Sequence, residues 1–182
     1  MREDWLIKDV ILVCPQVFKD NRGFFFEGYN SQEFKKNGID IDFLQDNYSK
    51  SCAKVLRGLH YQKPPYAQAK LIRCIKGKIL DIAVDLRADS PSFKQYVKLE
   101  LSEDNNYQLF IPEGFAHGYV VLSDEACISY KVNKNYEPNF ETGIIWNDKT
   151  LNIDWDIDFE PILSEKDKKL PFFEEVELWE CL

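Results

Sequence analysis

The chain has 182 residues, of which 45% are hydrophobic and 30% charged, and its formal net charge at pH 7 is −8. This length suits one domain with a real core, and the composition is that of a globular protein rather than a disordered one. The negative charge argues against a nucleic-acid-binding surface, because phosphate binding needs clustered Lys and Arg. We therefore expect a single domain over residues 1–182 with no nucleic-acid partner.

Neither a membrane span nor an export signal is indicated. No apolar run reaches the ~18 residues that cross a bilayer, and the chain begins MREDWLIKDV, with acidic side chains among its first residues. The five cysteines never form a CxxC pair, which argues against a disulfide framework and against a zinc knuckle. We expect a cytoplasmic protein that does not contact a membrane and whose thiols are reduced and mostly buried.

Short apolar runs separated by turn residues follow one another between residues 8 and 133. In chain order they read VILV, GFFFEGY, VLRGLHY, KLIRCI, KILDIAVDL, YVKLEL, YQLFI, GYVVL and CISYKV. This spacing predicts an antiparallel sandwich or barrel. Alternation is clearest over residues 78–86, so one face of that strand should be core. Turn residues at 76–78, 90–91 and 103–106 predict hairpins between neighbouring strands.

Helix-forming patterns are scarce. One short helix is predicted over Gln32–Lys36, with Ser31 as its N-cap and Gly38 as its stop. A second is predicted over residues 164–169, ending before Pro171. Both would lie at the periphery of a mainly β domain.

The only two histidines, His60 and His117, each lie in a strand-like run that contains glycine. Such a histidine is often half-buried and satisfied by one hydrogen bond, without a chemical role. Here the runs read RGLHYQ and PEGFAHG, which is the spacing of the two cupin motifs. Metal-binding cupins offer H-x-H in the first motif, whereas this chain has Gln62. A tight divalent metal site is therefore disfavoured, which leaves the cavity for organic acid and base chemistry.

Nine ordered blocks between about residue 8 and residue 171 are more specific together than any one motif is alone. They are RGFFFE from residue 22, QDNYSKS from 45, VLRGLHYQ from 55, QAKLIR from 68, the segment 81–91, PEGFAHG from 112, Tyr130-Lys131, GIIWND from 143 and LSEKD from 163. As a set they resemble the dTDP-4-dehydrorhamnose 3,5-epimerase family. The resemblance implies a cupin jelly-roll sandwich, or double-stranded β-helix, with short peripheral helices. Residues 172–182 carry no signature of this family.

The resemblance also implies proton transfer next to a ketone, without cofactor or metal. His60 would be the base, because imidazole titrates near neutral pH, and Asp167 would fix its tautomer. Residues 164–167, SEKD, also form a helix-capping box, and the spacing leaves both readings of Asp167 open. Lys70 would stabilise the enolate and Tyr130 would be the acid. Their alternatives are an outward, solvated lysine and a packing tyrosine.

Ligand contacts follow from the same resemblance. It assigns them to Arg22, Phe25, Glu27, Gln45, Asn47, Arg57, His117, Tyr136 and Lys166. Cations suit a pyrophosphate, although Arg22 and Glu27 would serve equally well as a surface ion pair. The resemblance further implies a homodimer in which N-terminal strands are exchanged, so that exposed sheet edges are covered.

The predicted reaction is 3,5-epimerisation of dTDP-4-dehydro-6-deoxy-D-glucose to dTDP-4-dehydro-L-rhamnose, a step of L-rhamnose biosynthesis. The nearest alternative is an enzyme that inverts C3 only, on a related nucleotide-linked 4-keto-6-deoxy sugar. A metal-dependent cupin enzyme is a second alternative, which Gln62 disfavours. A non-catalytic sugar-binding cupin is a third, but it would not need His60, Lys70, Tyr130 and Asp167 together.

Overall fold

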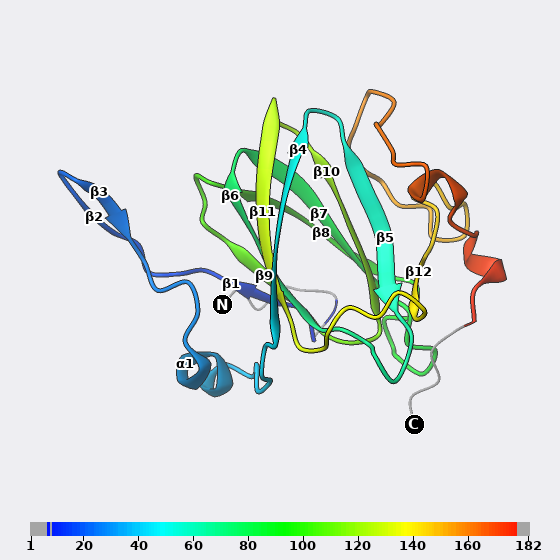
Figure 1. The fold of residues 1–182 in the computed structure, drawn as a ribbon, viewed down its shortest axis with the longest axis horizontal. Helices are drawn as coiled ribbons and strands as arrows, with labels where there is room; N and C mark the ends of the chain where they lie inside the picture. Colours follow the sequence, from blue (N-terminus) through cyan, green and yellow to red (C-terminus); the bar gives the residue numbers. More distant parts are fainter. Residues whose placement is uncertain (1–6, 8, 178–182) are drawn as a thin grey trace.

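The computed structural model describes residue 7 and residues 9–177, which fold mainly into antiparallel strands (Figure 1). One five-stranded sheet has the order β1-β9-β6-β11-β4, a second has the order β12-β5-β10-β7-β8, and β2 and β3 form a separate hairpin. The strands are β1 Ile11–Val13, β2 Phe18–Asp20, β3 Gly23–Phe25, β4 Gln45–Cys52, β5 Leu56–Gln62, β6 Lys70–Lys76, β7 Lys78–Asp85, β8 Tyr96–Ser102, β9 Gln108–Ile111, β10 Phe115–Val121, β11 Glu125–Val132 and β12 Glu141–Gly143. The predicted cupin-type jelly-roll sandwich is confirmed.

Each of the nine predicted runs contains a strand, but the sequence pattern does not reveal β2, β4 or β12. The longest of these, β4, reads QDNYSKSC and lies at the edge of its sheet, paired only with β11. An edge strand with polar residues on both faces lacks the apolar alternation by which strands are recognised. The other two strands are three residues long, too short for any period to show.

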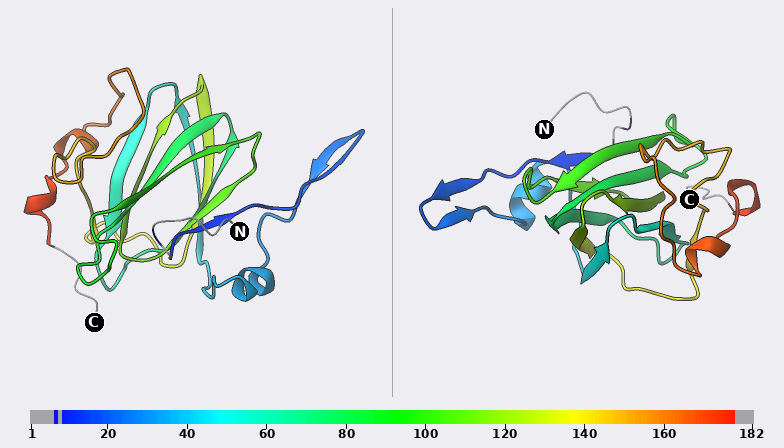
Figure 2. Two further views of the ribbon diagram at one scale, coloured as in Figure 1. Left: turned by 180° about the vertical axis from the view of Figure 1, so that it is seen from behind. Right: turned by 90° about the horizontal axis from the view of Figure 1, so that it is seen from above.

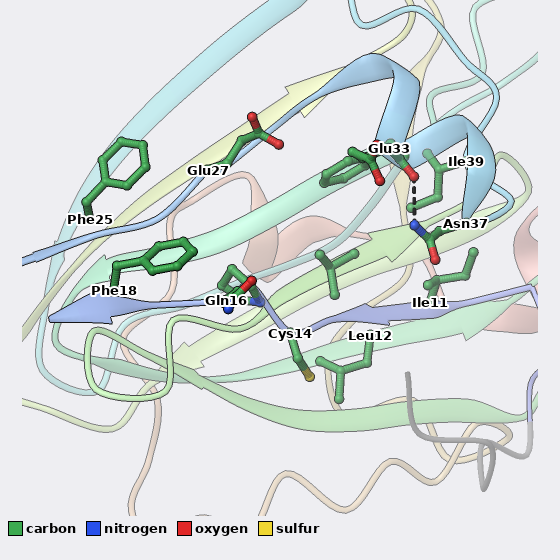
Figure 3. Close-up of a pocket in the computed structure, with 13 residues that line it drawn as sticks. Ile11, Leu12, Cys14, Gln16, Phe18, Phe25, Glu27, Glu33, Asn37 and Ile39 are labelled. Carbon is green, nitrogen blue, oxygen red and sulfur yellow. Dashed lines mark hydrogen bonds between the residues drawn. The ribbon is translucent and has the colours of Figure 1, made fainter.

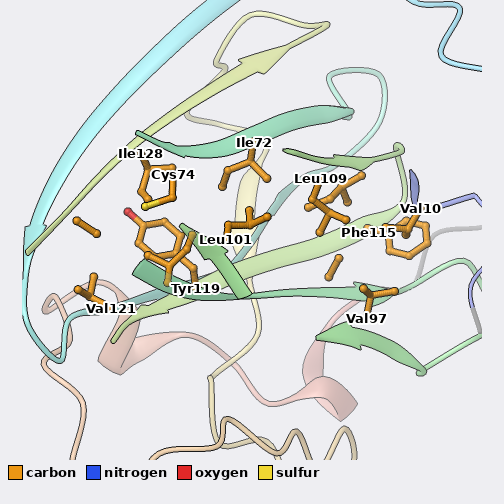
Figure 4. Packing of buried hydrophobic residues seen from close by; sticks show 14 of the residues in the cluster. Val10, Ile72, Cys74, Val97, Leu101, Leu109, Phe115, Tyr119, Val121 and Ile128 are labelled. Atoms are coloured by element: carbon orange, nitrogen blue, oxygen red, sulfur yellow. The ribbon is translucent and has the colours of Figure 1, made fainter. Parts of the chain in front are cut away.

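The main core lies between the two sheets, where side chains from β6, β9 and β11 meet others from β7, β8 and β10 (Figure 4). Strand β7 is buried on both faces. Its residues Ile79 and Ala83 face the core between the sheets, whereas Ile82 and Val84 pack in a second cluster with Trp155 of the C-terminal segment. That segment therefore covers the outer face of the second sheet and brings residues 160–173 against β5.

Two of the three predicted hairpins are wrong. The turn at 90–91 does join the paired strands β7 and β8, but the turns at 76–78 and 103–106 each connect strands of different sheets. Gly77 makes the first corner with φ of +77°, where a Cβ would lie 2.0 Å from the Glu125 carbonyl oxygen. The Glu103 carboxylate accepts the Gly77 N–H at 2.7 Å, so the two corners support each other. Local turn chemistry does not distinguish a hairpin from a jelly-roll crossing.

The predicted helix at Gln32–Lys36 is present as α1, but it spans Ser31–Lys36 and its N-cap is Asn30 rather than Ser31. The Asn30 side-chain oxygen accepts the N–H groups of the second and third helical residues at 3.1 and 3.4 Å. The second predicted helix shrinks to a 3₁₀ turn, η1, at Asp167–Lys169, followed by η2 at Phe173–Glu175. Leu170 is already extended because it precedes a proline, which stops the turn from continuing.

The β2–β3 hairpin projects away from the sandwich (Figure 2). Its phenylalanines are exposed, Phe25 by 68%.

Among the described cysteines, Cys74 and Cys127 are buried whereas Cys14 and Cys52 are exposed, so the expectation of mostly buried thiols does not hold for these four. Cys181 lies outside the described residues. No helix within residues 9–177 is both long enough and apolar enough to traverse a bilayer.

Candidate active site

Chemically active side chains from both sheets meet in a cavity of about 190 Å³. Strands β5 and β10 of one sheet contribute His60 and His117, and strands β6 and β11 of the other contribute Lys70 and Tyr130. The described residues that line it are Ser49, Arg57, His60, Tyr61, Gln62, Gln68, Lys70, His117, Tyr119, Tyr130, Tyr136 and Glu141. The two histidines therefore line the cavity from one sheet, and the lysine and tyrosine line it from the other.

Glycine allows β5 and β10 to approach closely enough to place the two histidines opposite each other. A Cβ on Gly58, whose φ is +120°, would lie 2.6 Å from the Gly118 Cα atom. A Cβ on Gly118 would in turn lie 2.7 Å from the Arg57 carbonyl oxygen. The pairing brings His60 into register with His117. Any larger residue at either glycine would push the strands apart.

His60 contacts Asp167, which reaches it from η1 in the C-terminal segment. The distance between His60 Nε2 and Asp167 Oδ1 is 2.5 Å. The Asp167 side chain is nearly buried, whereas that of His60 stays 28% exposed. Asp167 Oδ2 accepts the Ser164 hydroxyl at 2.8 Å, and the Asp167 N–H donates to Ser164 Oγ at 3.0 Å. The contacts with Ser164 and with His60 therefore coexist, because they use different atoms of Asp167. The Asp167 carboxylate accepts the Ser164 hydroxyl, however, and not the Ser164 N–H that a capping box would use.

Asp167 is held ionised. Burial alone would raise the pKa of this carboxyl, but the hydrogen bonds from His60 and Ser164 and the charge of Arg57 lower it below its ordinary value. An ionised carboxylate accepts the His60 Nε2–H hydrogen bond. That tautomer leaves the lone pair of His60 Nδ1 free to take a proton.

A second pair, His117 and Asp81, lies deeper in the same region. His117 Nε2 is 2.9 and 3.1 Å from the two Asp81 carboxylate oxygens, and both side chains are buried. Burial lowers the pKa of His117, an effect that Asp81 opposes. Sequence reasoning did not identify Asp81 as a partner of His117. The signal lay in the topology, because β10 and β7 are neighbours and Asp81 is in register with Tyr119.

Lys70 points inward, which contradicts the outward, solvated alternative. It is 8% exposed, and its Nζ donates to the carbonyl oxygen of His60 at 3.4 Å. Burial lowers the pKa of Lys70 to about 8, although the charges of Asp81 and Glu141 act in the other direction. Tyr130 is half-buried in the same cavity, and burial raises the pKa of its phenol. A protonated lysine and a protonated phenol are both suited to an oxygen that gains negative charge.

Gln62, where metal-binding cupins offer a second histidine, is fully engaged with the backbone. Its amide nitrogen donates to the carbonyl oxygens of Tyr66 at 2.7 Å and Asn135 at 3.3 Å. Its amide oxygen accepts the Glu137 N–H at 2.7 Å. Gln62 thus holds the segment that carries Tyr136 and has no free end for a ligand. Within the described part of the chain, no three His, Cys, Asp or Glu residues gather around a point that could hold a metal ion.

Of the residues assigned to ligand contacts, Arg57, His117 and Tyr136 line the cavity. Gln45 does not line it, but its amide oxygen accepts the Tyr136 N–H at 3.0 Å and its amide nitrogen donates to Asn47 at 2.7 Å. Gln45 and Asn47 therefore support the Tyr136 segment from outside the cavity.

Glu141 lines the cavity and was not identified from the sequence. It accepts the Tyr136 hydroxyl at 2.5 Å and forms an ion pair with Lys166. Burial would raise the pKa of Glu141, but these two donors lower it. No motif marks this glutamate. Only the pairing of β12 with β5, which sets Glu141 opposite Gln62, brings it to the site.

Three predicted ligand residues, Arg22, Phe25 and Glu27, do not line the cavity at His60. Arg22 on the projecting hairpin pairs with Asp20 at 2.5 Å, so the alternative ion pair with Glu27 does not form either. Phe25 and Glu27 line a separate cavity of about 560 Å³ between the hairpin, β1 and α1 (Figure 3). Among the described residues, those that line this cavity are largely apolar and include no histidine, lysine or arginine.

The chain is similar to nucleotide-sugar epimerases in both sequence and fold. The sequence profile of the dTDP-4-dehydrorhamnose 3,5-epimerase family matches residues 4–175. The dTDP-4-dehydrorhamnose 3,5-epimerase of Shigella flexneri is 52% identical over 162 residues, which cover 88% of this chain and 89% of that one. The resemblance found in the sequence is thereby confirmed.

Solved structures agree. The Legionella pneumophila dTDP-6-deoxy-D-glucose-3,5-epimerase, in complex with dTDP-4-keto-L-rhamnose, has a TM-score of 0.94 and 38% identity, covering 98% of this chain and 96% of that one. A 3'-monoepimerase from Streptomyces bikiniensis, in complex with dTDP-quinovose, has a TM-score of 0.87 and 30% identity, covering 92% and 85%. On both sequence and structure, the chain belongs to the dTDP-4-dehydrorhamnose 3,5-epimerase family.

Proposed function

We propose that this protein converts dTDP-4-dehydro-6-deoxy-D-glucose to dTDP-4-dehydro-L-rhamnose by inverting C3 and C5, as a step of L-rhamnose biosynthesis. One observation carries the proposal. His60, paired with the buried carboxylate of Asp167, shares a single cavity with Lys70 and Tyr130. Base, electrophile and acid are the three groups that reversible deprotonation next to a ketone requires.

Each step uses a named atom. His60 Nδ1 removes the proton from the carbon beside the 4-keto group, and Asp167 stabilises the imidazolium that forms. The Lys70 ammonium stabilises the negative charge on the enolate oxygen. Tyr130 then donates a proton to the same carbon from the other side of the sugar. Because His60 and Tyr130 belong to facing sheets, they can address opposite faces of the ring, which is what inversion needs.

A nucleotide-linked substrate suits the polar rim of the cavity. Arg57 lines it, and Lys166 lies beside it through its ion pair with Glu141. These two cations match a pyrophosphate. The complex of the Legionella pneumophila relative with dTDP-4-keto-L-rhamnose supports dTDP as the nucleotide.

We further propose a homodimer in which the β2–β3 hairpin reaches the partner subunit. Phe18, Phe24 and Phe25 are 55%, 59% and 68% exposed on a hairpin that projects from the body. An exchange would bury these rings and carry Arg22 and Phe25 toward the partner's cavity, which accounts for their distance from His60 within one chain. The location that we propose for this dimer is the cytoplasm, because the four described cysteines are free thiols, which a reducing compartment preserves.

A C3-only epimerase is the alternative that one finding favours, since the Streptomyces bikiniensis monoepimerase shares this fold. The fold therefore does not decide between one inversion and two. Tyr130, on the sheet that faces His60, can act as the acid in either reaction, so the two reactions are separated by experiment.

The experiment is incubation of the purified protein with dTDP-4-keto-6-deoxyglucose in deuterated water, with the positions of exchange read by NMR. Deuterium at both C3 and C5 supports the double epimerase. Deuterium at C3 alone supports the alternative. No deuterium at either carbon contradicts the proposed substrate.

A further inference from the structure

The carboxylate of Asp167 has a second partner that the mechanism above does not use. Ser164 lies in the loop before η1, and its hydroxyl makes two hydrogen bonds to the same residue. Ser164 Oγ accepts the Asp167 N–H at 3.0 Å and donates to Asp167 Oδ2 at 2.8 Å. The Ser164 carbonyl oxygen also accepts the Lys168 N–H at 3.1 Å. The serine is thus fixed to the backbone of the turn that follows it.

This double contact determines how the Asp167 side chain is rotated. Because Ser164 Oγ already accepts the N–H, its own hydrogen is directed at Oδ2. With Oδ2 held, Oδ1 is the oxygen left for His60 Nε2, at 2.5 Å. Among the described residues, His60 and Ser164 are the only side chains that hydrogen-bond this carboxylate.

We propose that Ser164 is a positioning residue for the reaction, whose hydroxyl holds the Asp167 carboxylate in the rotation that aims Oδ1 at His60. This inference rests on the proposed function of His60 and Asp167. Asp167 is 3% exposed and sits in a three-residue turn, so water cannot easily replace the lost donor. A residue that acts through another affects the chemical step more than substrate binding.

The charged and titratable groups around the pair are known, so a shift in pH dependence can be assigned. They are Arg57 on β5, Lys70 on β6, Asp81 on β7, His117 on β10, Tyr130 on β11, Glu141 on β12 and Lys166 before η1. None of them changes in a Ser164 variant. Loss of the hydroxyl removes a donor to the charged carboxylate, so Asp167 and His60 together should hold a proton more tightly.

The test compares Ser164→Ala and Ser164→Thr with wild type, with kcat and KM measured from pH 5 to pH 9. In Ser164→Ala we expect kcat to fall on the order of 10- to 100-fold with KM within about twofold. The acidic limb of kcat/KM should move to higher pH. Ser164→Thr keeps the hydroxyl, so it should have most of the wild-type kcat and the acidic limb of kcat/KM at the wild-type pH.

Ser92→Ala is the matched control. Ser92 Oγ donates to the buried carboxylate of Asp85 at 2.7 Å, outside the cavity of His60. The Ser92→Ala substitution removes the same type of hydrogen bond. It should lower the melting temperature without moving the acidic limb of the kcat/KM profile. If Ser164→Ala does not fold, Ser164→Thr and Ser164→Val replace it, because they differ by the hydroxyl at equal size.

Two results would overturn the inference. One is that Asp167→Asn is inactive, whereas Ser164→Ala keeps the wild-type kcat and the wild-type acidic limb of kcat/KM. The other is an equal loss in Ser164→Ala and Ser164→Thr with no shift of the limb, which would mean a purely structural role. Wild-type activity in Asp167→Asn is a different result, since it would remove the proposed function of the pair itself.

Discussion

The molecule contains two histidine–aspartate pairs that use the same atoms in different surroundings. In the first, His60 keeps 28% of its side chain exposed and lies 2.5 Å from Asp167. In the second, the His117 side chain is 8% exposed and lies 2.9 Å from Asp81, which is fully buried. An imidazole that is partly open to a cavity can exchange protons with a substrate. An imidazole that is enclosed with its carboxylate is better suited to holding strands together.

The two pairs also differ in how the chain builds them. Asp81 and His117 come from neighbouring strands of one sheet. Asp167 is 107 residues from His60 and reaches it through the C-terminal segment that packs on the outer face of that sheet. One pair is therefore built within a single sheet, whereas the other is completed by a turn from outside that sheet.

The largest expected effect is on activity, and it comes from the first pair. His60→Ala should lower kcat by about 10²- to 10⁴-fold, because it removes the general base. The free energy of unfolding should fall by only about 1 kcal/mol, since Ser164 still satisfies Asp167. A coupled assay and urea unfolding measure the two quantities. A loss of activity below tenfold in His60→Ala would contradict the catalytic role that distinguishes this pair from the other.

The second pair should show the reverse pattern. His117→Ala leaves the carboxylate of Asp81 buried without its partner, so the free energy of unfolding should fall by about 3 kcal/mol. At saturating substrate, activity of the folded fraction should fall far less than in His60→Ala. Urea unfolding of both variants under identical conditions tests the ranking. A smaller loss of stability in His117→Ala than in His60→Ala contradicts it.

Lys70 lies near both pairs, since its Nζ donates to the His60 carbonyl oxygen and the charge of Asp81 acts on its pKa. Its effect should be seen in the pH dependence of kcat/KM. Its pKa is about 8 rather than 10.5, because burial disfavours the ammonium. Since only the charged form stabilises an enolate, kcat/KM should decline as pH rises through about 8. Lys70→Arg keeps its charge above that pH, so the basic limb should move upward even if the maximum rate is lower. A profile with the same basic limb in both proteins would exclude Lys70 as its origin.

The smallest expected effect is that of chelation. Both histidines direct Nε2 at a carboxylate, and both ends of the Gln62 amide are engaged by backbone groups. Dialysis against EDTA should therefore leave kcat and the melting temperature unchanged. Loss of activity that returns with one divalent metal would contradict this assignment of the donor atoms.

The sequence predicted the apolar strands well, because alternation and turn residues are local properties. It did not reveal β4, whose polar residues pair only with β11 at a sheet edge, or the sheet crossings at Gly77 and Glu103. Crossings depend on which sheet a strand joins. That choice depends on packing across the whole core, which no short window of sequence records.

At the site, too, local sequence patterns were predicted and contacts between distant segments were not. His60, Lys70 and Tyr130 were placed in strand-like runs, and the structure brings them to one cavity. The contacts of Asp81 and Glu141 with the site residues were not predicted, because they arise from strand neighbours distant in sequence. Of the two readings of Asp167, the structure shows the contact of its carboxylate with His60, while the capping-type contact is limited to its N–H, which donates to Ser164 Oγ.

The most direct test of the central claim is the rate of deuterium incorporation into dTDP-4-keto-6-deoxyglucose, measured side by side for His60→Ala and His117→Ala below both unfolding midpoints. We predict that His60→Ala incorporates no deuterium at C3 or C5 in the time that wild type needs for completion, whereas His117→Ala does so at saturating substrate. Two results would contradict the account. One is deuterium incorporation by His60→Ala at nearly the wild-type rate, and the other is a lack of incorporation in His117→Ala while His60→Ala still incorporates deuterium.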